Sequence, residues 1–427
     1  MDEQTKRKIN LKIYPIYRMF SLDLLFYYAI SFLFLTQIKG ISAAQILLID
    51  AFYPLFQIIF QPFSLIIADR IGKRKSLILG NSFMAGSIFI LIVGNGIYTY
   101  LIFDIVMAFG YVIKELCGPI LLNDSIPENK YKLNIFTKIE GKGTSHYWAL
   151  AAISSIITGF LYVTNPYLPM IICLIFCLLA ALLAFAMNDI ENYKSTEESP
   201  ISMHNKEYIK TMQQVFKFIF KSTRLRALLL SSGVMMAFAN LFGTYRSSLL
   251  VFINVPAQYF GIILASAQIL TSIASKKSQW IHMHFKDKTL TFLSLPASVL
   301  FLITGLLLIF QSNNIIIYIS IFIMIALIHI SKGPYSVLIK RYFNSFSSPD
   351  INTKIYTAKA FAESIIRLPI FLFASFLLYK TTIDYAIVIL GAFLVITFIL
   401  LSQYMKTRIG LNPEEYNKKD IEFHLLK

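Results

Sequence analysis

The sequence predicts an all-α integral membrane protein with 12 transmembrane helices, arranged as two six-helix, pseudo-symmetric bundles with both termini in the cytoplasm. Apolar residues make up 56% of the 427 residues and charged residues only 15%, below the roughly 25% of soluble domains. Several apolar segments reach the length of about 20 residues that a spanning helix needs. Of the 39 Lys and Arg residues, only Lys39 and Lys380 fall in segments expected outside, as the positive-inside rule describes.

The first half of the chain contains six predicted helices. Asn165-Pro166 is typical of a tight turn between the last two. The polar segment 125–145, with alternating charge, predicts an inside loop that holds a short surface helix. The six helices are expected at residues 13–36, 44–68, 76–94, 100–123, 147–163 and 168–187.

The second half repeats this plan after a long polar stretch. We predict an N-terminal bundle over 1–188, a cytoplasmic linker over 189–226, a C-terminal bundle over 227–406 and a cytoplasmic tail over 407–427. Within the linker, residues 206–221 have the basic and aromatic pattern of an amphipathic helix on the inner membrane surface. The helices of the second bundle are expected at 227–252, 257–275, 290–310, 315–339, 356–379 and 385–404.

Two Gly-Pro pairs lie at equivalent depths in the fourth and tenth predicted helices. Gly118-Pro119 follows Lys-Glu-Leu-Cys, and Gly333-Pro334 follows His-Ile-Ser-Lys. Proline removes the hydrogen bond to the carbonyl four residues earlier, so we expect both helices to bend beside their own charged residues. The repetition indicates an internal duplication, the plan in which a transporter binds its substrate near the bilayer midplane.

Eight ionisable residues are expected deep in the membrane. Charge there costs at least about 2.5–3.5 kcal/mol on insertion scales, so each is a functional candidate. Residues nearer to helix ends, such as Arg18, are expected to reach the interface instead. The eight are Asp23, Lys114, Glu115, Arg246, His329, Lys332, Glu363 and Arg367.

The carboxylates of this set are candidates for proton coupling, because burial favours the protonated form and a nearby cation favours the ionised form. We take Glu115 first, then Asp23, then Glu363. Four fixed cations against these three carboxylates favour an anionic or zwitterionic solute. Interhelical ion pairs that fix packing are the alternative role for each residue. The substrate-cavity candidates are Lys114, Arg246, His329, Lys332 and Arg367.

A basic cluster separates the second and third predicted helices. It reads Asp-Arg-Ile-Gly-Lys-Arg-Lys and includes Asp69, Arg70, Gly72, Lys73 and Arg74. A turn of this composition between two membrane-length segments is typical of the cytoplasmic side. The spacing resembles the loop between helices 2 and 3 of the major facilitator superfamily.

The resemblance implies the twelve-helix fold of that superfamily, with helices 1, 4, 7 and 10 lining a cavity. It also implies that Asp69 lies near the start of helix 11, and that Lys73 pairs with Asp124 to latch the outward-open state. The segment Asn123-Asp124-Ser125 resembles the end of helix 4 in bacterial efflux-type members. The chain departs from the family at Leu65, where Gly is usual, and lacks the glycine-proline signature of helix 5.

We therefore predict a secondary transporter of a small organic solute, working by alternating access and coupled to protons, with export favoured. The alternatives are a proton-coupled importer of an anionic or zwitterionic metabolite and a non-transporting membrane sensor. No metal-ligand spacing, nucleophile–base motif or nucleotide-binding loop is present, so we expect neither an enzyme nor an ATP-driven pump, and no cofactor. We expect a monomer in the bacterial plasma membrane that binds no nucleic acid.

Overall fold

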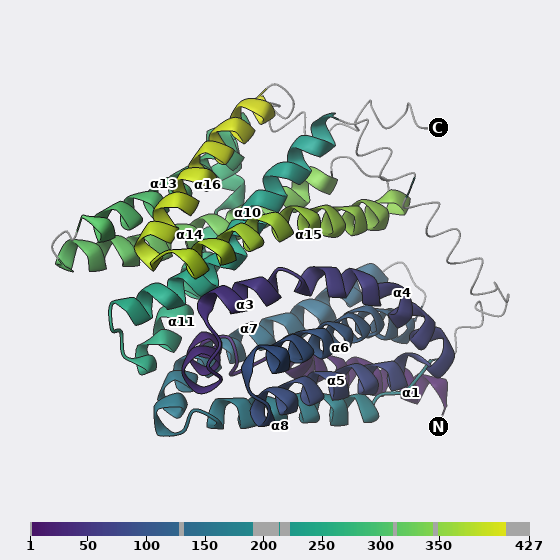
Figure 1. The fold of residues 1–427 in the computed structure, drawn as a ribbon. Coiled ribbons are helices and arrows are strands. Elements are labelled where there is room, and N and C mark those ends of the chain that lie inside the picture. Colours follow the sequence, from purple (N-terminus) through teal and green to yellow (C-terminus); the bar gives the residue numbers. More distant parts are fainter. Residues whose placement is uncertain are drawn as a thin grey trace. The chain divides into compact units, whose positions relative to one another are not determined.

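The computed structural model describes residues 2–127, 132–190, 213, 223–310, 314–344 and 349–406. The expected amphipathic helix at 206–221 and the expected tail at 407–427 lie outside these ranges. All regular structure in them is helical (Figure 1). The elements are α1 (Glu3–Ser21), α2 (Ser31–Leu33), the π-helix η1 (Phe34–Ile38), α3 (Ala43–Asp50), α4 (Tyr53–Ile71), α5 (Lys73–Val93), α6 (Gly96–Ser125), α7 (Lys132–Thr164), α8 (Leu168–Phe185), α10 (Thr223–Phe252), α11 (Ala257–Lys276), α12 (Ser278–Phe285), the 3-10 helix η2 (Lys286–Lys288), α13 (Thr289–Ile309), α14 (Asn314–Asn344), α15 (Pro349–Lys380) and α16 (Ile383–Lys406).

Eleven helices of the described residues are long and apolar enough to cross a membrane. Their exposed surface is rich in Ile, Leu and Phe side chains, as expected of helices that face lipid. The protein is therefore a multi-pass membrane protein. The segment predicted as the first span is not among the eleven, because its helix is interrupted.

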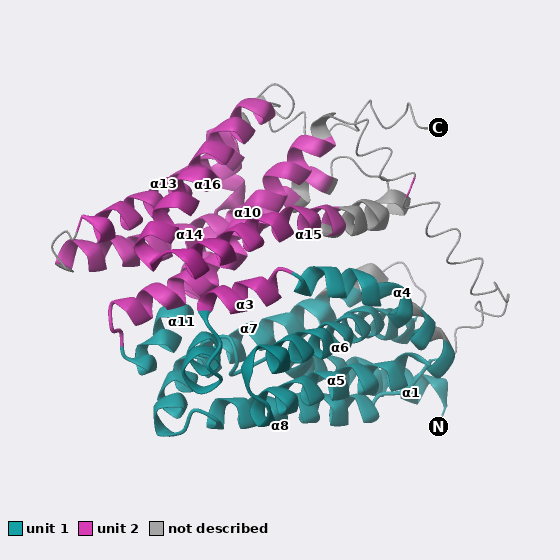
Figure 2. Ribbon diagram, viewed as in Figure 1, with its two compact units in different colours: residues 1–42, 52–205, 256–265 teal, residues 43–51, 206–255, 266–427 magenta. Residues whose placement is uncertain are grey.

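The chain forms two compact units (Figure 2). The first contains residues 1–42, 52–205 and 256–265, and the second contains residues 43–51, 206–255 and 266–427. The division follows the two sequence halves except for two exchanged segments, because α3 packs with α15 and the start of α11 packs with α7. The close approach of Gly159 on α7 to Gln258 on α11 makes that second contact possible.

In the first unit, α5 packs along α6 at backbone contact. A Cβ atom added to Gly110 would lie 2.7 Å from the carbonyl oxygen of Gly80, and one added to Gly80 would lie 3.0 Å from that of Gly110. Small residues allow such close approach, and membrane helices depend on it because lipid supplies no hydrophobic force between them. Residues of α1, α6 and α8, such as Tyr14, Cys117 and Ala184, complete a buried core.

The prediction of one continuous helix over 13–36 is wrong. Helix α1 ends at Ser21, and helical structure resumes only at Ser31. The Asp23 carboxylate accepts a hydrogen bond from the Leu24 amide at 2.8 Å, which offers the backbone an alternative to the helix. Phe26, with a φ of 65°, lies in the same interrupted segment.

The second predicted helix, over 44–68, is also interrupted. Helix α3 ends at Asp50, and α4 begins at Tyr53 with Pro54 in its first turn. Pro54 has no N–H to donate to the Asp50 carbonyl, so the break lies where this proline frees a carbonyl. Arg367 on α15 supplies the missing donor, with Nη2 3.0 Å from that oxygen.

Three other boundaries differ from the sequence prediction. Helix α7 begins at Lys132, so part of the predicted loop at 125–145 is a continuation of the fifth span. Helix α12 lies between the eighth and ninth predicted spans, where no helix was predicted. Helix α15 begins at Pro349 rather than at 356. In α7 and α15 polar residues extend the helix beyond its apolar part, where hydropathy gives no signal.

We expect Gly110→Ala to lower the apparent melting temperature, because the added methyl group collides with the α5 backbone. Overpacking of this kind costs about 1–3 kcal/mol. The matched control is Gly86→Ala on α5, where an added Cβ meets nothing within 4 Å. This control should leave stability unchanged or raise it by up to about 1 kcal/mol through helix propensity. Equal melting temperatures for the two variants in detergent would contradict the proposed backbone contact.

Candidate functional site

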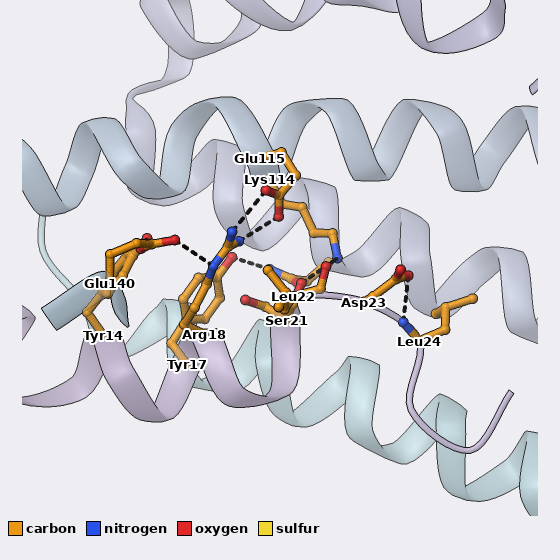
Figure 3. Close-up of polar contacts among 11 residues, drawn as sticks. Tyr14, Tyr17, Arg18, Ser21, Leu22, Asp23, Leu24, Lys114, Glu115 and Glu140 are labelled. Atoms are coloured by element: carbon orange, nitrogen blue, oxygen red, sulfur yellow. Dashed lines mark hydrogen bonds and ion pairs between the residues drawn. The ribbon is translucent and has the colours of Figure 1, made fainter. Parts of the chain in front are cut away.

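A buried arginine joins three helices of the first unit (Figure 3). Arg18 on α1 forms a bidentate ion pair with Glu115 on α6, at 2.5 Å and 3.0 Å. Its Nε atom lies 3.0 Å from Oε1 of Glu140 on α7. The hydroxyl of Tyr14 donates to the second oxygen of Glu140 at 2.7 Å.

This network differs from the sequence prediction in two ways. Arg18 was expected to reach the membrane interface, yet its side chain is only 8% exposed and holds two carboxylates. Glu140 was expected in a loop, and the extension of α7 brings it to Arg18. Glu115, the first candidate for proton exchange, is therefore held as an ion by a fixed partner. The only sequence signal for the pair was the place of Arg18 within an apolar run.

Lys114 is adjacent to Glu115 in sequence but contacts a different element, as expected for residues about 100° apart on a helix. Its ammonium group donates to the carbonyl oxygens of Ser21 and Leu22, the latter at 3.3 Å (Figure 3). These carbonyls belong to the end of α1, where no further helical turn supplies donors. Lys114 thus stabilises the interruption of the first span.

Asp23 lies in that interruption. Its carboxylate accepts hydrogen bonds from the Leu24 amide and from the Tyr28 hydroxyl, both at 2.8 Å. No cation of the described chain lies within ion-pair distance of it, although Lys114 is near enough to interact electrostatically. Asp23 therefore differs from Glu115 and Glu140, since it can change its charge without breaking an ion pair.

The second unit contains the remaining candidates. Glu363 on α15 pairs with Lys359 one turn earlier, at 2.9 Å. Arg367, a further turn along, donates to the Asp50 carbonyl and stacks on Phe371, with 4.3 Å from Cζ to the ring centre. Lys359, Glu363 and Arg367 follow one another at successive turns of α15, but only the first two pair, because Arg367 contacts α3.

Arg246, His329 and Lys332 are the candidates on α10 and α14. The Thr271 hydroxyl lies 3.2 Å from Nδ1 of His329 and donates to the carbonyl oxygen of the same residue at 3.1 Å. The structure records no hydrogen bond or ion pair for the side chains of Arg246 and Lys332 with any residue it describes. Gly333 allows α14 to approach α11, because an added Cβ would lie 2.6 Å from the Thr271 carbonyl oxygen.

The two Gly-Pro pairs lie inside continuous helices, since α6 and α14 both extend beyond their prolines. Gly118 makes only ordinary contacts, with its Cβ position 3.6 Å from the Tyr14 hydroxyl. Gly333 is therefore required by packing, whereas bending at Pro119 and Pro334 stays a prediction.

The basic cluster between α4 and α5 contacts two other helix ends of the first unit. Lys73 pairs with Asp124 at 2.5 Å, the contact that the family resemblance implied. The Arg74 amide donates to Asp189 at 2.8 Å, and Gly72 has a φ of +85° beside the same carboxylate. An acid at the first turn of α5 complements the positive end of the helix dipole. Sequence analysis missed Asp189.

The other members of the cluster are less informative. Arg70 is exposed, and the side chain of Asp69 lies outside the described part of the structure. Arg7, which the sequence analysis did not single out, donates to the Asp124 carbonyl at 2.8 Å.

No group of three His, Cys, Asp or Glu side chains among the described residues could hold a metal ion.

We expect Arg18→Met to destabilise the protein strongly, because it leaves the carboxylates of Glu115 and Glu140 buried without their cation. Removing one partner of a buried pair costs about 3–5 kcal/mol. The triple variant Arg18→Met/Glu115→Gln/Glu140→Gln should recover most of this loss in the apparent melting temperature. Arg70→Met, at an exposed position, is the control and should leave the melting temperature unchanged. Equal losses in the single and triple variants would show that the charges do not stabilise one another.

Comparison with known proteins agrees with this architecture. The sequence pattern of the Major Facilitator Superfamily matches residues 19–366. None of the curated proteins matches the chain. Among solved structures, the nucleoside transporter NupG has a TM-score of 0.66 at 12% identity, covering 95% of this chain and 100% of its own.

Two further structures have the same fold. A bacterial homologue of the human lysosomal transporter Spinster gives a TM-score of 0.66 at 11% identity, covering 96% of this chain and 99% of its own. A D-xylose–proton symporter gives 0.63 at 12% identity, covering 96% and 98%. At these identities the structures show a shared fold alone, whereas the family pattern covers most of the chain. The protein therefore belongs to the Major Facilitator Superfamily of membrane transporters.

Proposed function

We propose that this protein is a proton-coupled secondary transporter of a small organic solute and that it works by alternating access. The observation that carries the coupling proposal is the environment of Asp23. Its carboxylate lies in the interruption of the first span, with two hydrogen-bond donors and without an ion-pair partner among the described residues. Discontinuous helices are where many secondary transporters bind substrates and coupling ions.

Asp23 suits proton exchange better than the two glutamates do. Protonating Glu115 would leave Arg18 with one carboxylate in place of two, and protonating Glu363 would leave Lys359 unpaired. Breaking such a pair costs several kcal/mol, because the remaining charge stays buried. Protonating Asp23 breaks no ion pair among the described residues. We therefore rank Asp23 ahead of Glu115 and Glu363, which exchanges the first two places of the order drawn from the sequence.

Lys114 is proposed to act with Asp23. Its ammonium group is bound to the two carbonyls that precede Asp23, and its charge acts on the carboxylate. When Asp23 gains a proton this attraction is lost, and the α1 carbonyls become the stronger partners of the ammonium group. A proton would thereby change the forces on the interrupted segment. The direction of transport is proposed as export, on the resemblance of Asn123-Asp124-Ser125 to efflux-type members.

The test is solute-driven proton movement in proteoliposomes that contain the purified protein and an internal pH dye. Solutes are added in separate panels of neutral sugars and nucleosides, zwitterions, organic anions and lipophilic cations. Asp23→Asn should abolish proton movement but keep solute counterflow, because exchange of bound solute needs no proton. Asp384→Asn, at the start of α16, is the control and should retain both.

Two results would overturn parts of this proposal. Proton movement that persists in Asp23→Asn and disappears in a stably folded Glu115→Gln would restore Glu115 as the coupling residue. A folded protein that moves no solute from any panel would favour the membrane-sensor alternative.

We expect the pair of Lys73 and Asp124 to bias the conformational equilibrium of the transporter. Asp124→Lys should place two cations together and slow transport by about 5–30-fold, the effect of one to two kcal/mol on such an equilibrium. The exchanged pair Lys73→Asp/Asp124→Lys should recover most of the rate, measured as counterflow of the identified solute. If the double variant is as slow as the single one, the loss reflects the Asp124 position rather than the pair.

A further inference from the structure

We propose that Arg246 and Lys332, with His329 between them, form a binding site for a compact oxyanion in the second unit, so that the transported solute carries a carboxylate or phosphate group. This inference rests on the proposed transport function for its biological meaning. The site itself rests on the contacts of α10 and α14.

The two helices bring the three side chains near one another. The ring of Phe242 on α10 packs against that of His329 on α14, with 6.4 Å between ring centres. Arg246 follows Phe242 by four residues and therefore lies one turn along the same face of α10. Lys332 follows His329 by three residues on the same face of α14. Arg246 and Lys332 act electrostatically on each other and on His329.

These cations lack the counter-charges that their position requires. Arg246 is only 9% exposed and Lys332 is half-buried, yet neither has a hydrogen-bond or ion-pair partner among the described residues. The deep carboxylate on α15, Glu363, is already paired with Lys359. A buried charge without a partner costs free energy, and two like charges close together add to it.

The other interior cations are all occupied. Arg18 binds two carboxylates, Lys114 binds the carbonyls at the end of α1, and Arg367 binds the Asp50 carbonyl. Lys39 donates to the Ile92 and Gly94 carbonyls, each at 2.8 Å. Arg246 and Lys332 differ from these four cations, because their side chains have no hydrogen-bond or ion-pair partner among the described residues.

Their donors fit an oxyanion. A guanidinium group presents parallel N–H groups that match two oxygens of a carboxylate or phosphate, and an ammonium group adds a mobile point charge. The single proton of the Thr271 hydroxyl is drawn to the carbonyls of Ala267 and His329, at 3.0 Å and 3.1 Å. Nδ1 of His329 therefore serves as the donor to Thr271. Nε2 of the neutral ring can then only accept a hydrogen bond from a solute, so the donors to the oxyanion come from Arg246 and Lys332.

The first test needs no known solute. In ligand-free protein, Arg246→Met and Lys332→Met should leave the apparent melting temperature unchanged or raise it, because each removes a buried, uncompensated charge. The matched control is Lys359→Met, which breaks the pair with Glu363 and should lower it. A loss in Arg246→Met as large as in the control would overturn the proposal, since it would reveal a structural partner for the arginine.

The second test measures binding to the full-length protein in nanodiscs at constant ionic strength with chloride. The probes are methyl phosphate, inorganic phosphate, acetate and succinate, compared with the neutral methanol, acetamide and succinamide. We expect at least one anion to bind and its neutral analogue not to bind. Arg246→Gln should weaken that binding by about 30-fold or more, the effect of removing one partner of a buried charge pair.

The pattern across the probes identifies the oxyanion, because a preference for methyl phosphate over acetate indicates a phosphate ester and the reverse indicates a carboxylate. Binding that is equal in wild type and Arg246→Gln, or a panel in which no anion binds, overturns the proposal. The two proposals fail in different measurements. This one fails if anion binding is unchanged in Arg246→Gln, whereas the coupling proposal fails if proton movement persists in Asp23→Asn.

Discussion

The structure depends on satisfying backbone carbonyls where helices end inside or near the membrane. Hydrocarbon offers no water to replace the lost hydrogen bonds, so each free carbonyl needs a donor from the protein. Basic side chains provide that donor repeatedly. Lys114 serves the end of α1, Lys39 the end of α5 and Arg367 the end of α3. Arg7 and Arg74 do the same for α6 and α8 through the carbonyls of Asp124 and Phe185.

A cation suits this task because the C-terminal end of a helix carries partial negative charge. The caps allow the first two spans to be interrupted without exposing unsatisfied polar groups. The interruptions place irregular backbone, and with it the acidic side chain of Asp23, within the spans. The charges that sequence analysis placed deep in the membrane thus divide into capping groups, ion pairs, Asp23 and the uncommitted pair on α10 and α14.

The Arg18 network shows how a carboxylate can be buried and still be unsuited to proton exchange. One guanidinium group holds Glu115 and Glu140 on two different helices, and Tyr14 adds a neutral donor. The arrangement joins α1, α6 and α7 within the first unit at one point. Asp23 lies only five residues from Arg18 in the sequence, yet the end of α1 separates the two environments. Glu115 and Glu140 thus contribute to stability, whereas the proposed coupling role belongs to Asp23.

The sequence by itself determined the membrane class and the approximate place of most spans, because a bilayer demands apolar segments of a fixed length. The basic cluster between the second and third spans carried the resemblance to the family, and that resemblance implied the pair of Lys73 with Asp124. It could not locate the breaks after Ser21 and Asp50, since each lies within a segment that is apolar enough overall to be predicted as one span. It also could not give partners to the buried charges. Whether a lysine caps a helix, pairs with an acid or remains available to a solute depends on which helix lies opposite, and only tertiary packing decides that.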